Sequence, residues 1–137
     1  MRTAIDTNIL SAIWSNEPHA ANIPESLAAA RGEGALIVSA PVYVELLAYP
    51  NATEAFLNRF LGDTGISVDF DLSQPVWLEA GRRFARHAHR RRQSRAQEPK
   101  RFIADFVIGS HALKHADRLM TLDPKRYQRD FPELNLF

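Results

Sequence analysis

The sequence has no cysteine among its 137 residues. Disulfide bonds and thiolate metal sites are therefore excluded, and the composition is compatible with a reducing compartment. No apolar run approaches the roughly 20 residues that a membrane-spanning helix needs. The N-terminal segment also lacks a signal-peptide pattern, since an acid already stands at Asp6. We therefore expect a cytoplasmic protein with no membrane partner.

Net charge is almost absent as well, because 17 lysine and arginine residues face 16 acids, which leaves +1. The charges are nevertheless segregated. Nine basic residues lie between Arg82 and Arg101, with a single acid, Glu98, among them. A basic stripe of this kind indicates a polyanionic or acidic partner, with a solvated helix face as the alternative. The arginines of this stripe that we expect to contact such a partner are Arg82, Arg83, Arg86, Arg90, Arg91, Arg92 and Arg95.

The length and the hydrophobic fraction of 45% fit a single globular domain over residues 1–137. Short apolar runs predict strands at 2–6, 35–38, 66–70 and 118–121, with an edge strand at 134–137. Helical patterns cover 7–14, 19–31, 41–49, 52–61, 75–95 and 102–116. In the long basic helix, the predicted apolar stripe is Trp77, Ala80, Phe84 and Ala88. Strands that alternate with helices predict an α/β fold whose mainly parallel sheet is covered on both faces.

Four acids are predicted to lie where folds of this class bind ligands. Asp6 and Asp123 follow the first and fourth predicted strands, while Glu45 and Asp105 lie near the N-termini of apolar helices. These positions face the C-terminal edge of a parallel sheet, where ligands bind. Each acid alone has an ordinary alternative role as a helix cap, a turn residue or a first-turn acid. Together they predict one crevice of carboxylates that repel one another unless a cation binds.

Oxygen-only ligands favour Mg²⁺ or Mn²⁺ in that crevice. Such an ion activates water and stabilises charge on a phosphoryl oxygen. Thr7, Asn8 and Thr121 adjoin the acids and are candidates for holding a water or a phosphate oxygen, with capping and turn hydrogen bonds as their alternative role. His111 and His115 stand at i and i+4 as a possible zinc pair, but no third ligand follows in a recognisable pattern.

Four segments together resemble the PIN-domain nucleases, and in particular the VapC-type toxins of bacterial type II toxin–antitoxin systems. The segments are Asp6-Thr7-Asn8-Ile9-Leu10, Ser39-Ala40-Pro41-Val42-Tyr43-Val44-Glu45-Leu46, Phe102-Ile103-Ala104-Asp105 and Leu119-Met120-Thr121-Leu122-Asp123. The resemblance implies a three-layer α/β/α sandwich and a Mg²⁺- or Mn²⁺-dependent endoribonuclease. It implies that the catalytic and metal-binding residues are Asp6, Glu45, Asp105 and Asp123. It also implies a cognate antitoxin that blocks the site, and a homodimer.

One departure from the family pattern lies near the end of the chain. Many relatives carry a further acid three or four residues after the fourth acidic position, where this sequence has Arg126 and Tyr127. This departure bears on whether Asp123 would bind a metal directly or through water.

Three functions are compatible with these residues. The first is metal-dependent hydrolysis of RNA, with the RNA phosphates along the arginines of residues 82–95. The second is a non-catalytic RNA- or protein-binding module of the same fold that uses the same basic helix. The third is a phosphatase with Asp6 as nucleophile, but that pattern needs an aspartate two residues later, where the chain has Asn8.

Overall fold

A computed structural model of the protein describes residues 1–94 and 101–137. Its centre is a parallel sheet of four strands in the order β3-β2-β1-β4. The strands are β1 (Thr3–Ile5), β2 (Leu36–Ser39), β3 (Ile66–Asp69) and β4 (Arg118–Met120). Thr3 of β1 pairs with Leu36 on one side and with Arg118 on the other, so β1 is a central strand.

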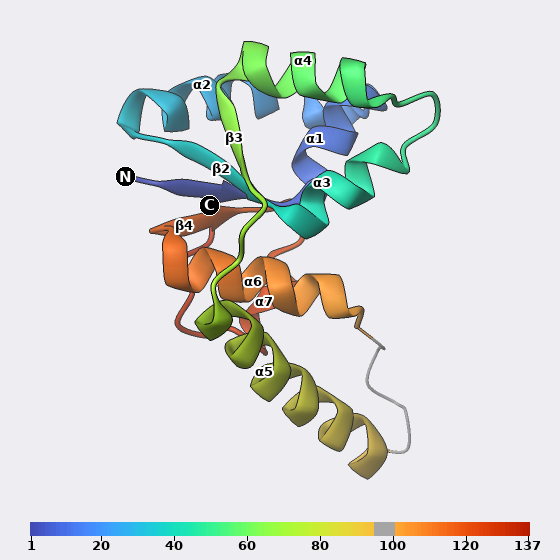
Figure 1. Ribbon diagram of the computed structural model, residues 1–137, viewed down its shortest axis with the longest axis vertical. Coiled ribbons are helices and arrows are strands. Elements are labelled where there is room, and N and C mark those ends of the chain that lie inside the picture. The colour runs from blue at the N-terminus through green and yellow to red at the C-terminus, as the bar shows by residue number, and fades with distance from the viewer. Residues whose placement is uncertain (95–100) are drawn as a thin grey trace.

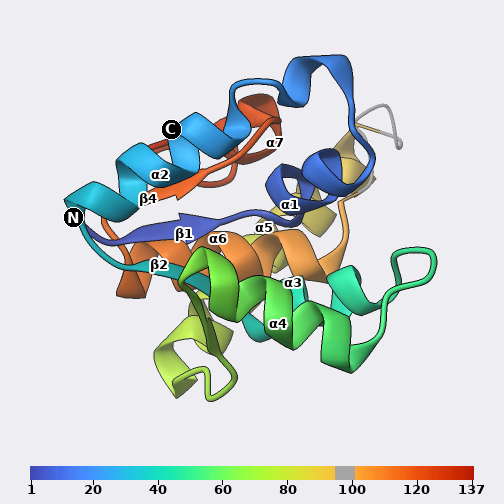
Figure 2. The ribbon, with the colours of Figure 1, turned by 90° about the horizontal axis from the view of Figure 1, so that it is seen from above.

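Helices cover both faces of this sheet. In the described ranges they are α1 (Thr7–Trp14), α2 (Ile23–Glu33), α3 (Ala40–Leu47), α4 (Glu54–Thr64), α5 (Gln74–Gln93), α6 (Ile103–His115) and α7 (Pro124–Gln128), with a 3₁₀ turn at Pro18–Ala20. Figure 1 shows α1, α2 and α4 above the sheet and α5, α6 and α7 below it. Figure 2 gives the same arrangement from above. The predicted α/β architecture with a parallel sheet between helical layers is confirmed.

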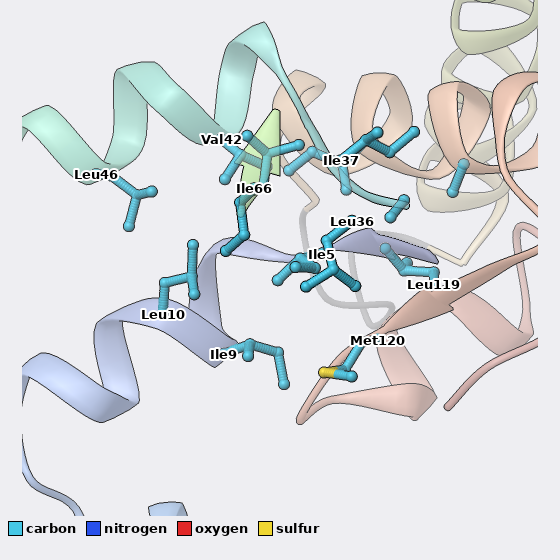
Figure 3. Close-up of a cluster of buried hydrophobic side chains, with 14 of the residues drawn as sticks. Ile5, Ile9, Leu10, Leu36, Ile37, Val42, Leu46, Ile66, Leu119 and Met120 are labelled. Carbon is cyan, nitrogen blue, oxygen red and sulfur yellow. The ribbon is translucent and has the colours of Figure 1, made fainter. Parts of the chain in front are cut away.

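Buried apolar side chains pack between the sheet and several helices, among them α1, α3 and α6, and Figure 3 shows a part of this core. Ile5 of β1, Leu10 of α1, Val42 of α3 and Leu119 of β4 are each at most 1% exposed. Fully burying a side chain of this size stabilises the fold by about 1.5–3 kcal/mol. This packing fixes the ends of β1 and β2 at the point where α1 and α3 begin.

Two predicted elements differ in extent from the structure. The edge strand expected at 134–137 is reduced to one parallel bridge between Leu136 and Leu119, beside a hydrogen bond of 2.9 Å from Phe137 N to Leu119 O. The helix expected over 19–31 begins only at Ile23, after the 3₁₀ turn. Pro24 occupies the first turn of α2, where its missing N–H costs nothing.

The apolar stripe predicted for the basic helix is confirmed at Ala80, which is buried, and at Phe84, which packs against the core, but it is wrong at Trp77. The buried side chains of α5 are those of Val76, Ala80, Arg83 and His87, whereas Trp77 is 51% exposed. Arg83 was expected on the exposed face of the helix, among the arginines of the basic stripe. The rotation of α5 instead turns Arg83 and His87 inward, where they find hydrogen-bond partners. No helix in the described ranges has both the length and the apolarity to cross a membrane.

Candidate active site

Asp6 occupies the centre of the candidate site, directly after β1, and is 1% exposed. Its Oδ1 accepts a hydrogen bond from the Thr7 backbone N–H at 2.8 Å and so caps α1. Its Oδ2 accepts hydrogen bonds from the hydroxyls of Thr121 at 2.9 Å and Tyr127 at 3.0 Å. Burial raises the pKa of Asp6, although these hydrogen bonds oppose the rise. The carboxylate is thus held in place by neutral donors but incompletely compensated in charge.

Glu45 reaches the same region from α3. This helix begins directly after β2 with a proline in its first turn, a position that suits proline. The Thr7 hydroxyl donates to Glu45 Oε1 at 2.6 Å, which ties α3 to the start of α1. Burial of the carboxyl group raises the pKa of Glu45, and repulsion from Asp6 and Asp105 adds to the rise. Glu45 therefore shares one electrostatic environment with the other acids.

Asp105 and Asp123 complete the group of acids. Asp105 lies in the first turn of α6 with its side chain 14% exposed, and Asp123 precedes α7 with its side chain 42% exposed. Burial raises the pKa of Asp105, and repulsion from Asp123 contributes to the rise. The four acids predicted from the sequence thus gather at the C-terminal edge of the sheet. We call Asp6, Glu45, Asp105 and Asp123 the acid cluster.

Arg126 supplies positive charge to this site, although the sequence marks it only as a departure from the family pattern. Its Nη1 lies 3.5 Å from Asp105 Oδ1, and its Nε lies 3.4 Å from Asp123 Oδ2. Burial alone would lower the pKa of Arg126, but attraction by Asp105, Asp6 and Asp123 raises it above its ordinary value. The sequence did contain a signal for this contact. Arg126 stands three positions after Asp123, and residues at this spacing lie on the same face of a helix.

The polar residues beside the acids hold the site together. Asn8 donates from Nδ2 to Thr121 Oγ1 at 3.3 Å and accepts from the Leu122 backbone N–H at 3.1 Å. Thr121 Oγ1 also accepts from the Asp123 backbone N–H at 3.1 Å. These contacts give Asn8 and Thr121 the turn-stabilising role that was their alternative, and they fix the loop after β4 against α1.

The donor set fits Mg²⁺ or Mn²⁺ in its chemistry. Among residues 1–94 and 101–137, no three His, Asp or Glu side chains lie close enough together to hold one metal ion. Mg²⁺, however, usually takes one or two carboxylates and completes its shell with water and substrate phosphates. Burial is the main cause of the raised pKa of Asp6, Glu45 and Asp105, so these carboxylates have lost solvation that a bound cation would replace.

The histidine pair considered for zinc makes other contacts. His111 is 1% exposed, and its Nε2 lies 3.1 Å from Asp69 Oδ2. His115 Nε2 lies 3.0 Å from Ser73 Oγ. The two histidines therefore connect α6 to the end of β3 and to the start of α5.

The arginines predicted to face RNA divide into several groups. Arg83 is 7% exposed and is held inside by Glu79 Oε2 at 2.8 Å, the Asp130 carbonyl at 2.6 Å and Glu133 Oε1 at 2.5 Å. Its placement is structural, which corrects the expectation that it faces RNA. Arg90 contacts Asp130 and has its side chain 29% exposed. Arg82, Arg86 and Arg92 are exposed, Arg91 is half-buried, and Arg95 lies outside the described residues.

The basic helix α5 packs against α6, the helix that carries Asp105, through Phe84 and His87. The Arg101 backbone N–H donates to His87 Nε2 at 3.2 Å, which joins the start of α6 to the second half of α5. Figure 1 shows both helices below the sheet, close together where α5 begins and α6 ends and farther apart towards the C-terminal end of α5. The exposed arginines of α5 are thus attached to the layer of the molecule from which Asp105 enters the acid cluster.

Comparison with known proteins gives both a family and a fold. The family model described as PIN domain matches residues 3–132. The structure of VapBC2 from Rickettsia felis, bound to a DNA fragment from their promoter, is similar over 100% of this chain and 98% of that chain, with 19% identity and a TM-score of 0.66. The structure of VapBC-1 from nontypeable Haemophilus influenzae is similar over 100% and 97%, with 22% identity and a TM-score of 0.65. Among curated proteins, none matches the sequence.

Proposed function

Because the chain belongs to the PIN domain family, we propose that it is a Mg²⁺- or Mn²⁺-dependent endoribonuclease and the toxin of a toxin–antitoxin pair. PIN domains are generally nucleases, which supports a hydrolase that acts on nucleic acid. The observation that carries the proposal is the acid cluster itself. Its members come from four separate elements, and three of them have a raised carboxyl pKa.

Each acid has a distinct place in this proposal. Asp6 and Asp105 are the least exposed members of the acid cluster, and they would hold the metal ion with least competition from solvent. A metal ion there would lower the pKa of a water molecule and stabilise charge on a phosphate. Glu45, whose pKa is raised, would accept the proton of the attacking water. Asp123, whose side chain is 42% exposed, would act through a water.

The exposed arginines of α5 supply the second part of the proposal. RNA phosphates would lie along Arg82, Arg86 and Arg92 and lead towards the start of α6. Binding through phosphates alone carries no sequence information. Selection of the cleaved sequence would therefore depend on contacts closer to the acid cluster.

The structural neighbours motivate the proposed partners. Both are VapBC structures, one of them with a DNA fragment. By analogy we propose a cognate antitoxin protein that blocks the acid cluster, a homodimer, and a cytoplasmic location.

The proposal is tested by incubating the purified protein with a mixed pool of cellular RNA in Mn²⁺, Mg²⁺ or chelator. Asp6→Ala should abolish cleavage. The matched control is Asp63→Ala, which removes an exposed acid from α4. This helix lies on the other side of the sheet from α6 (Figure 1). Metal-dependent fragments with wild type and Asp63→Ala, but not with Asp6→Ala, would support the nuclease. Equal cleavage by Asp6→Ala would overturn the site assignment.

The non-catalytic binding module remains the second candidate, because the exposed arginines of α5 would bind RNA whatever the acids do. The same preparation distinguishes the two functions. RNA binding without cleavage, together with an unchanged melting temperature in Mn²⁺, would favour the module, since a ligand of the folded state must raise that temperature.

A further inference from the structure

Arg126 contacts the oxygen atoms that a metal ion at the acid cluster would need. Its Nη1 lies 3.5 Å from Asp105 Oδ1, and its Nε lies 3.4 Å from Asp123 Oδ2. One guanidinium therefore spans two of the four acids, which come from different elements of the fold. A guanidinium keeps its charge at any ordinary pH. The acid cluster thus carries a permanent positive charge of its own.

We propose that Arg126 is an intramolecular counter-cation, which must leave Asp105 and Asp123 when a divalent metal ion binds at the acid cluster. This inference rests on the proposed metal-dependent function. A cation bound beside a fixed positive charge loses affinity, because the two repel and compete for the same oxygens. Arg126 therefore weakens metal binding and, in the absence of metal, stabilises the gathered acids.

The contacts of Arg126 are of a kind that allows this exchange. Both of its ion pairs are longer than a good charge-assisted hydrogen bond of about 2.7–2.9 Å. Its buried Nε has no hydrogen-bond partner within the part of the chain that the structure describes. Its side chain is 34% exposed, so it has an open route towards solvent. Arg83 offers a contrast, since its guanidinium makes three short hydrogen bonds in a buried position.

The same arrangement accounts for how the chain keeps four acids together without a metal ion. Asp6 is held by neutral donors, and Glu45 by the Thr7 hydroxyl, so neither contact supplies positive charge. The Arg126 guanidinium supplies positive charge 3.5 Å from Asp105 Oδ1 and 3.4 Å from Asp123 Oδ2. Removing Arg126 should therefore destabilise the metal-free protein and increase the stabilisation that metal provides.

The test measures Mn²⁺ binding by isothermal titration calorimetry and melting temperature in Mn²⁺ and in chelator. The variants are Arg126→Gln, Arg126→Lys and, as a matched control, Lys125→Gln. Lys125 is exposed on the same helix, and its change removes the same charge one position away. Arg126→Gln should bind Mn²⁺ about tenfold more tightly or better. It should melt at a lower temperature in chelator and gain more from Mn²⁺ than wild type does.

Arg126→Lys keeps the charge but loses the fork that spans two carboxylates, so its Mn²⁺ affinity should lie between those of wild type and Arg126→Gln. It also keeps the test decisive if the glutamine variant does not fold. Lys125→Gln should bind Mn²⁺ within about twofold of the wild-type affinity.

Equal Mn²⁺ affinity in wild type and both Arg126 variants would overturn the inference and leave the metal site standing. An equal gain in Mn²⁺ affinity in Lys125→Gln would also overturn the inference, because the effect would then come from net charge and not from the contacts of Arg126. Absence of Mn²⁺ binding in every protein would overturn the proposed function together with the inference.

Discussion

The Tyr127 hydroxyl donates a hydrogen bond of 3.0 Å to Asp6 Oδ2 across 121 positions of the sequence. Tyr127 is 0% exposed, and the centroid of its ring lies 6.2 Å from the ring centroid of Phe131. The short helix α7 thus orients a carboxylate that belongs to the end of β1. The C-terminal part of the chain is therefore a component of the candidate site, although none of the predicted catalytic acids lies in that helix.

Replacing Tyr127 with Phe removes this hydrogen bond and keeps the ring. The bond favours the ionised form of Asp6, so its loss should raise the pKa of Asp6 further. If ionised Asp6 is required, the acid limb of the pH profile of kcat/KM should move to higher pH. The free energy of unfolding should fall by about 1 kcal/mol.

The control for this variant is Tyr43→Phe, which removes a hydroxyl that donates to Asn58 Oδ1 at 2.8 Å. That hydrogen bond joins α3 to α4 and does not contact Asp6. An unchanged acid limb in Tyr127→Phe, or an equal shift in Tyr43→Phe, would show that Tyr127 does not set the protonation of Asp6.

RNA binding should depend on salt through the exposed arginines of α5. In an Asp6→Ala background that does not cleave, Arg86→Gln and Arg92→Gln should each reduce the slope of log affinity against log salt by about 0.7. Arg59→Gln is the control, because Arg59 is exposed on α4, on the other side of the sheet (Figure 1). Fluorescence anisotropy with a labelled single-stranded RNA measures all of these slopes. A slope that the two α5 variants leave unchanged would remove α5 from the RNA-binding surface.

Stability should respond to acid through Glu79. The hydrogen bond from Arg83 lowers the pKa of Glu79 from 4.5 to about 2. Stability from this pair is therefore present above about pH 4.5 and is lost as the pH falls towards 2. At pH 7, Glu79→Gln should lower the free energy of unfolding by about 1–3 kcal/mol.

The difference between wild type and Glu79→Gln should narrow as the pH falls from 4.5 to 2, because the native carboxyl group then becomes protonated too. Urea unfolding at several pH values measures this difference. Glu25→Gln, at an exposed position of α2, should change little at any pH. A difference for Glu79→Gln that stays constant with pH would contradict the role given to the Glu79–Arg83 pair.

Gly109 marks a close approach within the lower helical layer. A Cβ at this position would lie 2.5 Å from Phe131 Cε2, and Phe131 is 2% exposed. Gly109→Ala should therefore destabilise the protein by about 1–3 kcal/mol through overpacking. Gly81→Ala is the matched control, since a Cβ there meets nothing within 4 Å and alanine favours the helix by about 1 kcal/mol. Urea unfolding should give opposite signs for the two variants, and equal signs would contradict the packing of α6 on Phe131.

The sheet and the acids could be predicted because both depend on local patterns. Short apolar runs at β1 and β2 end directly at a turn into a helix, and a parallel order brings those ends to one edge. The positions of Asp6 and Glu45 follow from that topology alone. No side-chain geometry was needed to place them near each other.

The packing inside the helical layer formed by α5, α6 and α7 could not be predicted in the same way. Arg83 is buried because Glu133 and the Asp130 carbonyl, about 50 positions away, accept its hydrogen bonds. A helical pattern assigns arginine to the solvent side, and only the tertiary contacts reverse this for Arg83 and expose Trp77. The roles of Tyr127 and Arg126 were missed for the same reason, since both depend on contacts between α7 and distant segments.

Anomalous diffraction from crystals grown with Mn²⁺ tests most directly whether the acid cluster is a divalent metal site. We predict an anomalous peak in contact with Asp6 or Asp105 that is absent from crystals of Asp6→Ala. We also predict that the Arg126 guanidinium moves away from Asp105 when the peak is present. A Mn²⁺ peak at His111 and His115 instead, or an acid cluster without a peak at saturating Mn²⁺, would contradict the assignment of the metal site.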